Sequence, residues 1–139
     1  MPQLVECIPN FSEARRPDVV DQIVSAIRSV SEVRLLDRSS DLDHNRTVLT
    51  LAGPPLAVEE AAFQGIKKAA ELIDLDQHTG EHPRLGATDV VPFVPLSGVT
   101  MEDCIAMARR VGERVGNQLG IPVYLYEAAA TRQIGRAHV

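Results

Sequence analysis

Two short apolar runs, residues 33–36 and 47–51, follow one another with only a polar segment between them. The second run is rich in β-branched residues, and both are typical of strands. Parallel neighbours in a sheet need a crossover of a dozen or more residues, usually a helix, whereas antiparallel neighbours do not. The pair therefore predicts an antiparallel hairpin and disfavours a doubly wound parallel sheet.

The remaining periodicity places helices and strands around this hairpin. In chain order, the predicted elements are a strand at 4–8, a helix from 17, strands at 33–36 and 47–51, a helix at 56–73, a strand at 90–94, a helix from 101 and a strand at 123–126. The first six elements follow the split β-α-β order of ferredoxin-like folds. We therefore expect an α+β fold, ferredoxin-like β-α-β-β-α-β with an added α-β, whose mixed sheet has helices on one face.

Composition excludes several classes of protein. A chain of 139 residues with 45% apolar content is expected to form one globular domain. The net charge is −5 and no basic cluster exceeds a pair, which argues against a nucleic-acid partner. No apolar run approaches membrane-spanning length and no signal-peptide pattern is visible, so we expect no membrane partner and a cytoplasmic location. Cys7 and Cys104 fall on apolar patterns and are interpreted as buried free thiols.

The stretch from Gly80 to Asp89 has the most chemically informative residues. Gly80, Pro83 and Gly86 disfavour both helix and strand, so the stretch is expected to form a shaped loop. His82 within it can take and return a proton near neutral pH. The stretch also contains the charged residues Glu81, Arg84 and Asp89. The alternative interpretation is an ordinary turn with a surface histidine.

Metal and nucleotide sites are disfavoured. Residues 78–82 match the H-x-x-E-H zinc pattern, which requires both histidines on one helical face. Gly80 and Pro83 argue against such a helix, and no third ligand is evident, so no metal is predicted. The G-x-G-x-x-G and Walker patterns are absent, which makes a nucleotide ligand improbable.

Two further polar segments end predicted strands. Residues 37–45, with Asp37 and Asn45, are expected to form an unusually long hairpin loop, and such loops are often functional. The alternative is a solvated loop. Asn10 and Ser12 follow the first strand and either orient a ligand or cap a turn; the sequence favours the turn.

Together these segments resemble the N-terminal half of glutamate formiminotransferase, a family whose module is fused to a cyclodeaminase in many animals. The resemblance rests on five stretches, in family order and spacing: residues 5–13, 45–48, 80–89, 91–95 and 122–126. One departure is Ala14, where the family usually has glycine. The resemblance implies two similar ferredoxin-like halves with folate bound between them, and a homo-oligomeric full enzyme.

The resemblance also implies an activity: transfer of the formimino group from N-formimino-L-glutamate to N5 of tetrahydrofolate, the co-substrate, in histidine degradation. The family's catalytic histidine falls on His82, which would act as general base and then general acid. Because the amidine is cationic near neutral pH, the carboxylates of Glu81 and Asp89 are the candidates to stabilise it. Arg46 and Arg84 are expected to clamp substrate carboxylates. The further predicted contacts with substrate are Asn45, Asn10, Ser12 and Asp37.

Two other functions remain open at this point. A relative of the same fold could use a formyl folate in place of the formimino donor. A protein of a different class, a non-catalytic module, could bind folate or mediate assembly. A proton-relay histidine beside Glu81 and Arg84 favours the two enzymes, because a binder needs no relay.

The extent of the chain adds one expectation. Residues 1–133 are expected to form the N-terminal subdomain of the formiminotransferase module, without the second subdomain and any cyclodeaminase that would be its partners. Residues 134–139 fit no element and are expected to be a foreign or disordered tail. With half of the pocket missing, this chain alone is expected to be inactive.

Overall fold

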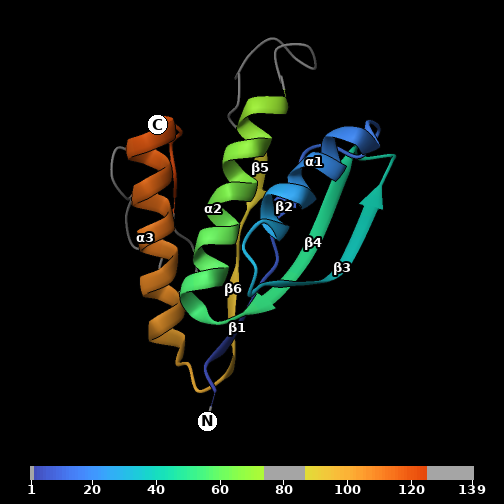
Figure 1. The fold of residues 1–139 in the computed structure, drawn as a ribbon. Coiled ribbons are helices and arrows are strands. Elements are labelled where there is room, and N and C mark those ends of the chain that lie inside the picture. The colour runs from blue at the N-terminus through green and yellow to red at the C-terminus, as the bar shows by residue number, and fades with distance from the viewer. Residues whose placement is uncertain (1, 74–86, 125–139) are drawn as a thin grey trace.

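The computed structural model describes residues 2–73 and 87–124. Its elements are β1 (Leu4–Cys7), β2 (Asn10–Phe11), α1 (Pro17–Arg28), β3 (Arg34–Asp41), β4 (Arg46–Gly53), α2 (Pro55–Leu72), β5 (Thr88–Val90), β6 (Phe93–Ser97) and α3 (Met101–Leu119). The protein is an α+β fold with three helices and one antiparallel sheet in the described residues (Figure 1).

The sheet is built around β4. One side of β4 pairs with β3, and the other side pairs with both β1 and β2. Outside these lie β6, which pairs with β1, and β5, which pairs with β2. Every pairing among the described residues is antiparallel, so the prediction of a mixed sheet is wrong for this part of the chain. The first and second predicted strands do run in the same direction, but β4 lies between them.

Two prolines divide two long strands into these shorter ones. Pro9 separates β1 from β2, and Pro92 separates β5 from β6. Proline has no backbone N–H to donate to a ladder, which accounts for the breaks at these two positions, whereas Pro95 is accommodated within β6. The interrupted strands stay together, because the backbone N–H of Ile8 donates to the Pro92 carbonyl at 3.1 Å and that of Leu49 to the Pro9 carbonyl at 3.1 Å. The turn predicted at residues 9–12 is therefore wrong in part, since Asn10 continues the strand.

The predicted long hairpin loop is also wrong. β3 extends to Asp41, so only residues 42–45 connect it to β4, and Asp37 lies within the strand opposite Thr50. Seven of the eight residues of β3 are exposed, which fits an edge strand with little contact to the core. A polar sequence is compatible with such a strand, because its side chains face water rather than neighbouring elements.

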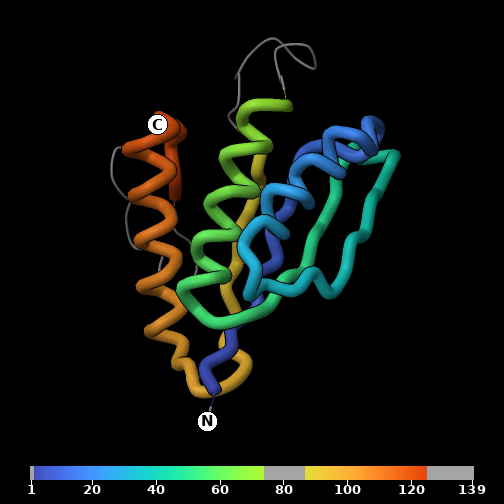
Figure 2. Tube along the Cα trace, in the orientation of Figure 1, coloured from blue at the N-terminus to red at the C-terminus, as the bar shows by residue number. Residues whose placement is uncertain are grey.

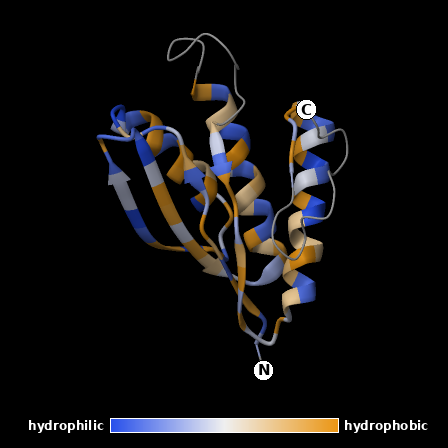
Figure 3. Ribbon diagram, turned by 180° about the vertical axis from the view of Figure 1, so that it is seen from behind, coloured by the Kyte–Doolittle hydropathy of each residue, from blue (hydrophilic) through white to orange (hydrophobic). Residues whose placement is uncertain are grey.

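The three helices lie on one face of the sheet, as predicted, and Figure 3 looks onto the opposite face, where the strands lie in front. The alternating burial of β4 accounts for this arrangement: Thr47, Leu49, Leu51 and Gly53 are buried toward the helices, and the residues between them are not. α1 and α2 pack closely at Gly65, where an added Cβ would lie 3.1 Å from the Ile27 side chain.

The predicted start of α3 at residue 101 is confirmed. The Thr100 hydroxyl accepts from the Asp103 backbone N–H at 3.0 Å, and the Asp103 carboxylate accepts from the Thr100 N–H at 2.9 Å. This reciprocal pair is a capping box. Gly120 ends the helix in the left-handed conformation, with φ of 69°. Of the last predicted strand, the structure describes only Val123 and Tyr124, and they lie in no strand longer than one bridge.

Several connections meet at one end of the molecule. Figure 2 shows that the end of β2, the start of α1, the β3–β4 turn, the end of α2 and the start of β5 all lie there. The start of α3 and the N-terminus lie at the opposite end. Most of the predicted site residues within the described part belong to the first of these ends.

Candidate active site

The predicted catalytic stretch lies largely outside the described residues. This applies to Glu81, His82 and Arg84, whose roles stay predictions. The described residues on either side of residues 74–86 are Ile73 and Ala87, and both are buried, with 1% and 2% of their surfaces exposed. Ile73 and Ala87 thus belong to the core at the end of the molecule where the connections meet.

Arg46 and Asp89 form an ion pair at this end. Arg46 begins β4 and Asp89 lies in β5, and the guanidinium Nη2 is 3.6 Å from the carboxylate Oδ2. Their side chains are 49% and 48% exposed. Such a distance is longer than an N–H···O hydrogen bond, so the two charges attract each other without a short bond. Both groups remain accessible to a ligand.

Asn10 lies between these two strands. It pairs with Val48 of β4 on one side and Val90 of β5 on the other, and its side-chain amide donates to the Ile8 carbonyl at 3.1 Å. Because side chains alternate along a strand, Asn10, Arg46 and Val48 share the sheet face opposite the helices. The structure therefore brings together three predicted site residues: Asn10, Arg46 and Asp89.

Asp37 is on the same sheet face but farther away. It is exposed and lies opposite Thr50, four residues along β4 from Arg46. At about 3.3 Å per residue, the two positions are roughly 13 Å apart. Asp37 and Arg46 cannot hold the same small group, although a long ligand could reach both.

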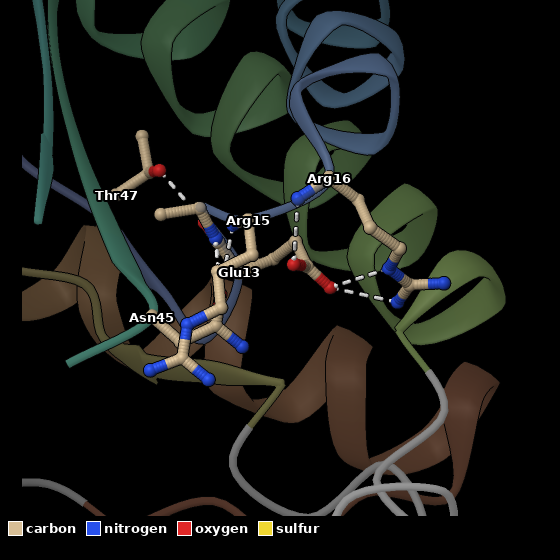
Figure 4. Close-up of polar contacts among 6 residues, drawn as sticks. Glu13, Arg15, Arg16, Asn45 and Thr47 are labelled. Carbon is tan, nitrogen blue, oxygen red and sulfur yellow. Dashed lines mark hydrogen bonds and ion pairs between the residues drawn. The ribbon is translucent and has the colours of Figure 1, made fainter. Parts of the chain in front are cut away.

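Asn45 is engaged with the chain itself. It lies in the left-handed region, with φ of 52°, in the turn between β3 and β4. Its side-chain oxygen accepts hydrogen bonds from the backbone N–H groups of Ala14 and Arg15, at 2.8 and 2.9 Å (Figure 4). Ser12, in the same β2–α1 loop, donates its backbone N–H to the Ala87 carbonyl at 2.9 Å.

Sequence reasoning missed a buried carboxylate next to this loop. Glu13 is 1% exposed, and its Oε1 accepts from Nε and Nη2 of Arg16 at 2.9 and 2.7 Å (Figure 4). Its Oε2 accepts from the Arg16 backbone N–H at 3.1 Å. A buried carboxylate is stable only when it is paired and hydrogen-bonded, and Arg16 supplies both. The sequence contained one indication of this contact. Arg16 immediately precedes the helix that starts at Pro17, but arginine is a poor N-cap residue because its side chain has no hydrogen-bond acceptor. Another residue was therefore required to accept from the backbone N–H groups at this helix start.

An apolar cavity of about 390 Å³ lies on the other side of β5, between α2, α3 and residues 121–124. Its lining includes Ile66, Val111, Val115 and the start of β5. The Thr88 hydroxyl oxygen is buried without a hydrogen-bond partner among the described residues. The cavity lies mainly on the helix side of the sheet, and Asp89, the ion-pair partner of Arg46, is one of its lining residues.

The two thiols are unsuited to catalysis. Cys7 and Cys104 are both buried and free, as predicted. Burial, which disfavours the thiolate, raises the pKa of Cys7 far above its ordinary value and also raises the pKa of Cys104. Burial therefore disfavours the nucleophilic thiolate form of both side chains.

The described residues contain neither a metal-binding cluster nor a membrane-spanning helix. No group of three His, Cys, Asp or Glu side chains within residues 2–73 and 87–124 is placed to hold a metal ion. In the same part of the chain, no helix combines the length and apolar character needed to cross a membrane.

Comparison with known proteins identifies the family. The family model for the formiminotransferase domain, N-terminal subdomain, matches residues 4–138. A glutamate formimidoyltransferase of Streptococcus pyogenes is 52% identical over 132 residues, which cover 95% of this chain and 44% of that protein. The glutamate formimidoyltransferase of Thermoplasma acidophilum is 57% identical over 129 residues, covering 93% of this chain and 43% of that protein.

A longer relative shows the same match. The formimidoyltransferase-cyclodeaminase of Sus scrofa is 48% identical over 136 residues, which cover 98% of this chain and 25% of that protein. The chain thus spans less than half the length of the curated relatives that it matches. It belongs to the formiminotransferase family and corresponds to the N-terminal subdomain of the formiminotransferase domain.

Proposed function

We propose that the protein containing this chain transfers the formimino group from N-formimino-L-glutamate to N5 of tetrahydrofolate, giving 5-formiminotetrahydrofolate and glutamate in histidine degradation. The observation that carries the proposal is the match of residues 4–138 to the family, with relatives of about 50% identity named glutamate formimidoyltransferases.

The Arg46–Asp89 pair supports this substrate class. N-formimino-glutamate has carboxylates and a cationic amidine. The pair offers the cationic guanidinium of Arg46 for a carboxylate and the anionic carboxylate of Asp89 for the amidine. Because the two side chains are half exposed and 3.6 Å apart, a substrate carboxylate can bind Arg46 while the amidine binds Asp89. The carboxylates of a folate tail would fit Arg46 equally well, so the described residues suit both substrates.

His82 is proposed as the proton carrier. When bound, tetrahydrofolate supplies the N5 amine that receives the group. The imidazole of His82 would accept the proton that N5 must lose and return it to the departing glutamate nitrogen. Asp89 or Glu81 would stabilise the positive charge of the amidine, for which an oxyanion hole would be unsuitable.

The wider architecture is also a proposal. The order of the strands supports a ferredoxin-like topology, if each proline-divided pair is counted as one strand. The order across the sheet is then β3, β4, the β1–β2 strand and the β5–β6 strand. We propose that a second subdomain of the same kind covers the exposed sheet face, and that folate binds between them. A homo-oligomeric full enzyme, a cyclodeaminase partner and a cytoplasmic location complete the proposal.

The test uses a full-length enzyme, made by replacing the matching segment of the Streptococcus pyogenes relative with this chain. Product formation is followed by ultraviolet absorbance after tetrahydrofolate and N-formimino-glutamate are mixed. His82→Ala should slow transfer by about 10²–10⁴-fold, the usual contribution of a general acid–base group.

His78→Ala is the matched control. A zinc site on residues 78–82 would need both histidines, whereas a proton relay needs only His82. Unchanged turnover in His82→Ala would refute the relay. Equal losses in both variants would favour the metal, and activity with a formyl folate but not with N-formimino-glutamate would favour the related transferase.

A further inference from the structure

We infer that Asn45 is a positioning residue: it fixes the β2–α1 loop (residues 12–16), and this loop binds the backbone of Ala87, which directly follows the stretch containing His82 in the sequence. The inference rests on the proposed function for its catalytic consequence. It assigns Asn45 a role other than the substrate contact expected from the sequence.

The first step is the hydrogen bonding between Asn45 and the loop. Its side-chain oxygen accepts from two consecutive backbone N–H groups, those of Ala14 and Arg15. A carbonyl oxygen has two lone pairs, so both are used by these bonds. That oxygen therefore cannot also bind a substrate while the loop holds its observed shape.

The second step is that other contacts from the same hairpin hold the loop. The buried hydroxyl of Thr47 donates to the Glu13 carbonyl at 2.7 Å and also bonds the Ser40 hydroxyl at 2.8 Å. The Arg15 guanidinium donates to the carbonyls of Leu42 and Asp43, at 2.9 and 3.0 Å. The loop is thus attached to the β3–β4 hairpin through both backbone and side chains.

The third step joins the loop to the stretch. The Ser12 backbone N–H donates to the Ala87 carbonyl at 2.9 Å, and Phe11 pairs with Thr88 in the ladder between β2 and β5. Ala87 directly follows Gly86 in the sequence and is buried. The Asn45 amide is therefore linked to Ala87 through its hydrogen bond to Ala14, the loop backbone from Ala14 to Ser12, and the hydrogen bond of Ser12 to Ala87.

The geometry of Asn45 makes the role testable. Its φ of 52° is tolerated by asparagine, aspartate and glycine. Asn45→Asp keeps the conformation and an acceptor oxygen, whereas Asn45→Gly keeps the conformation and removes the oxygen. A direct substrate ligand and a positioning residue respond differently to this pair.

The experiment measures kinetics and amide hydrogen exchange in the same full-length enzyme. Asn45→Gly should lower kcat by about 10- to 100-fold, as displaced catalytic groups do, while KM changes by less than about twofold. Exchange at the Ser12, Ala14 and Arg15 amides should accelerate in the same variant. Asn45→Asp should restore both properties, and Ser31→Gly, in the exposed turn before β3, should affect neither.

Several results would overturn the inference. Unchanged kcat and exchange in Asn45→Gly would show that the oxygen is not needed. A raised KM with unchanged exchange would make Asn45 a substrate ligand, and an Asn45→Asp variant as defective as Asn45→Gly would exclude the acceptor as the cause. If the unmodified enzyme has no transferase activity, the proposed function fails, and Ser12 exchange alone then decides whether Asn45 holds the loop at Ala87.

Discussion

At the scale of single residues, the pairing of Arg46 with Asp89 combines accessibility and opposite charge. Fully buried ion pairs lose much of their attraction to desolvation, and fully exposed pairs are screened by water. These side chains are both about half exposed, and no short hydrogen bond holds them together. A substrate carboxylate can therefore compete for Arg46 without breaking a strong internal contact.

Arg46→Ala should raise the KM for N-formimino-glutamate by about 10- to 100-fold in the full-length enzyme. The basis is the roughly 1.5–3 kcal/mol contributed by a hydrogen bond to a charged group. Arg34→Ala is the control, because Arg34 is also exposed and lies at the far end of the hairpin, opposite Ala52. Steady-state kinetics that show equal effects in both variants would remove the carboxylate role of Arg46.

The sequence identifies the polar and charged residues of the candidate site. It does not show which of them form hydrogen bonds within the protein instead of contacting a ligand. Arg46 and Asp89 were both selected, and the structure brings them together across about forty residues of sequence. The partners of Asn45 lie in another part of the chain, and no local pattern indicates them. The burial of Glu13 was missed for the same reason, since it depends on packing between elements rather than on neighbours in sequence.

At the scale of elements, α2 and α3 are joined by charged contacts at their exposed edge. Arg110 donates to both carboxylate oxygens of Glu59, at 2.8–3.1 Å. Arg114 donates to Glu60 at 2.6 Å and lies 3.7 Å above the Phe63 ring. A guanidinium that pairs with a carboxylate and covers an aromatic ring contributes through both charge and packing.

This contact should make stability depend on pH in the acid range. The Arg114 hydrogen bond, followed by that of Gln64, lowers the pKa of Glu60 below its ordinary value of 4.5. A lowered folded-state pKa gives stability that is complete above 4.5 and is lost as the pH falls through the folded value. Thermal unfolding from pH 7 to pH 3 should therefore show a smaller loss of Tm in Glu60→Gln than in the unmodified chain. Glu113→Gln, at an exposed site on α3, should retain the original loss. Identical pH profiles for all three proteins would contradict the role of Glu60.

The helices were easier to predict than the strands, and the cause is physical. Each helix presents an apolar stripe to the sheet, and the cap of α3 is encoded in four successive residues. β3 is an edge strand with exposed polar side chains, so its sequence resembles a loop. The strand breaks at Pro9 and Pro92 were visible as prolines, but whether the chain turns or continues there depends on the pairing with β4 and β1.

At the scale of the whole molecule, the helices cover one face of the sheet (Figures 1 and 3). The strand registers place Asn10, Asp37 and Arg46 on the other face. Large apolar side chains also remain exposed: Leu36 at 56%, Leu42 at 61% and Leu96 at 51%. Leu36 and Leu96 lie in β3 and β6, at the two edges of the sheet in the described residues, and Leu42 lies in the β3–β4 turn, so these side chains do not form one patch. The proposed second subdomain would cover the sheet face that carries Arg46.

The 139-residue chain alone should consequently show little or no transfer, because half of the proposed pocket is missing. It should also self-associate with increasing concentration, since exposed apolar surface favours contact between copies. Absorbance assays and sedimentation velocity over a range of concentrations would measure both properties. Robust turnover by a monomeric chain would overturn the proposal that a second subdomain completes the site.

The position of β1 within the sheet has a consequence for biosynthesis. Val5 pairs with Gly53 on one side and with Pro95 on the other, so the first strand is an interior strand. Long-range pairing of this kind slows folding, because the intervening chain must be ordered first. On the ribosome, the nascent first strand must wait with one edge unpaired until β6 has left the exit tunnel. We expect newly made chains to depend on chaperones during that interval, and cotranslational protease resistance to appear only after β6 has emerged.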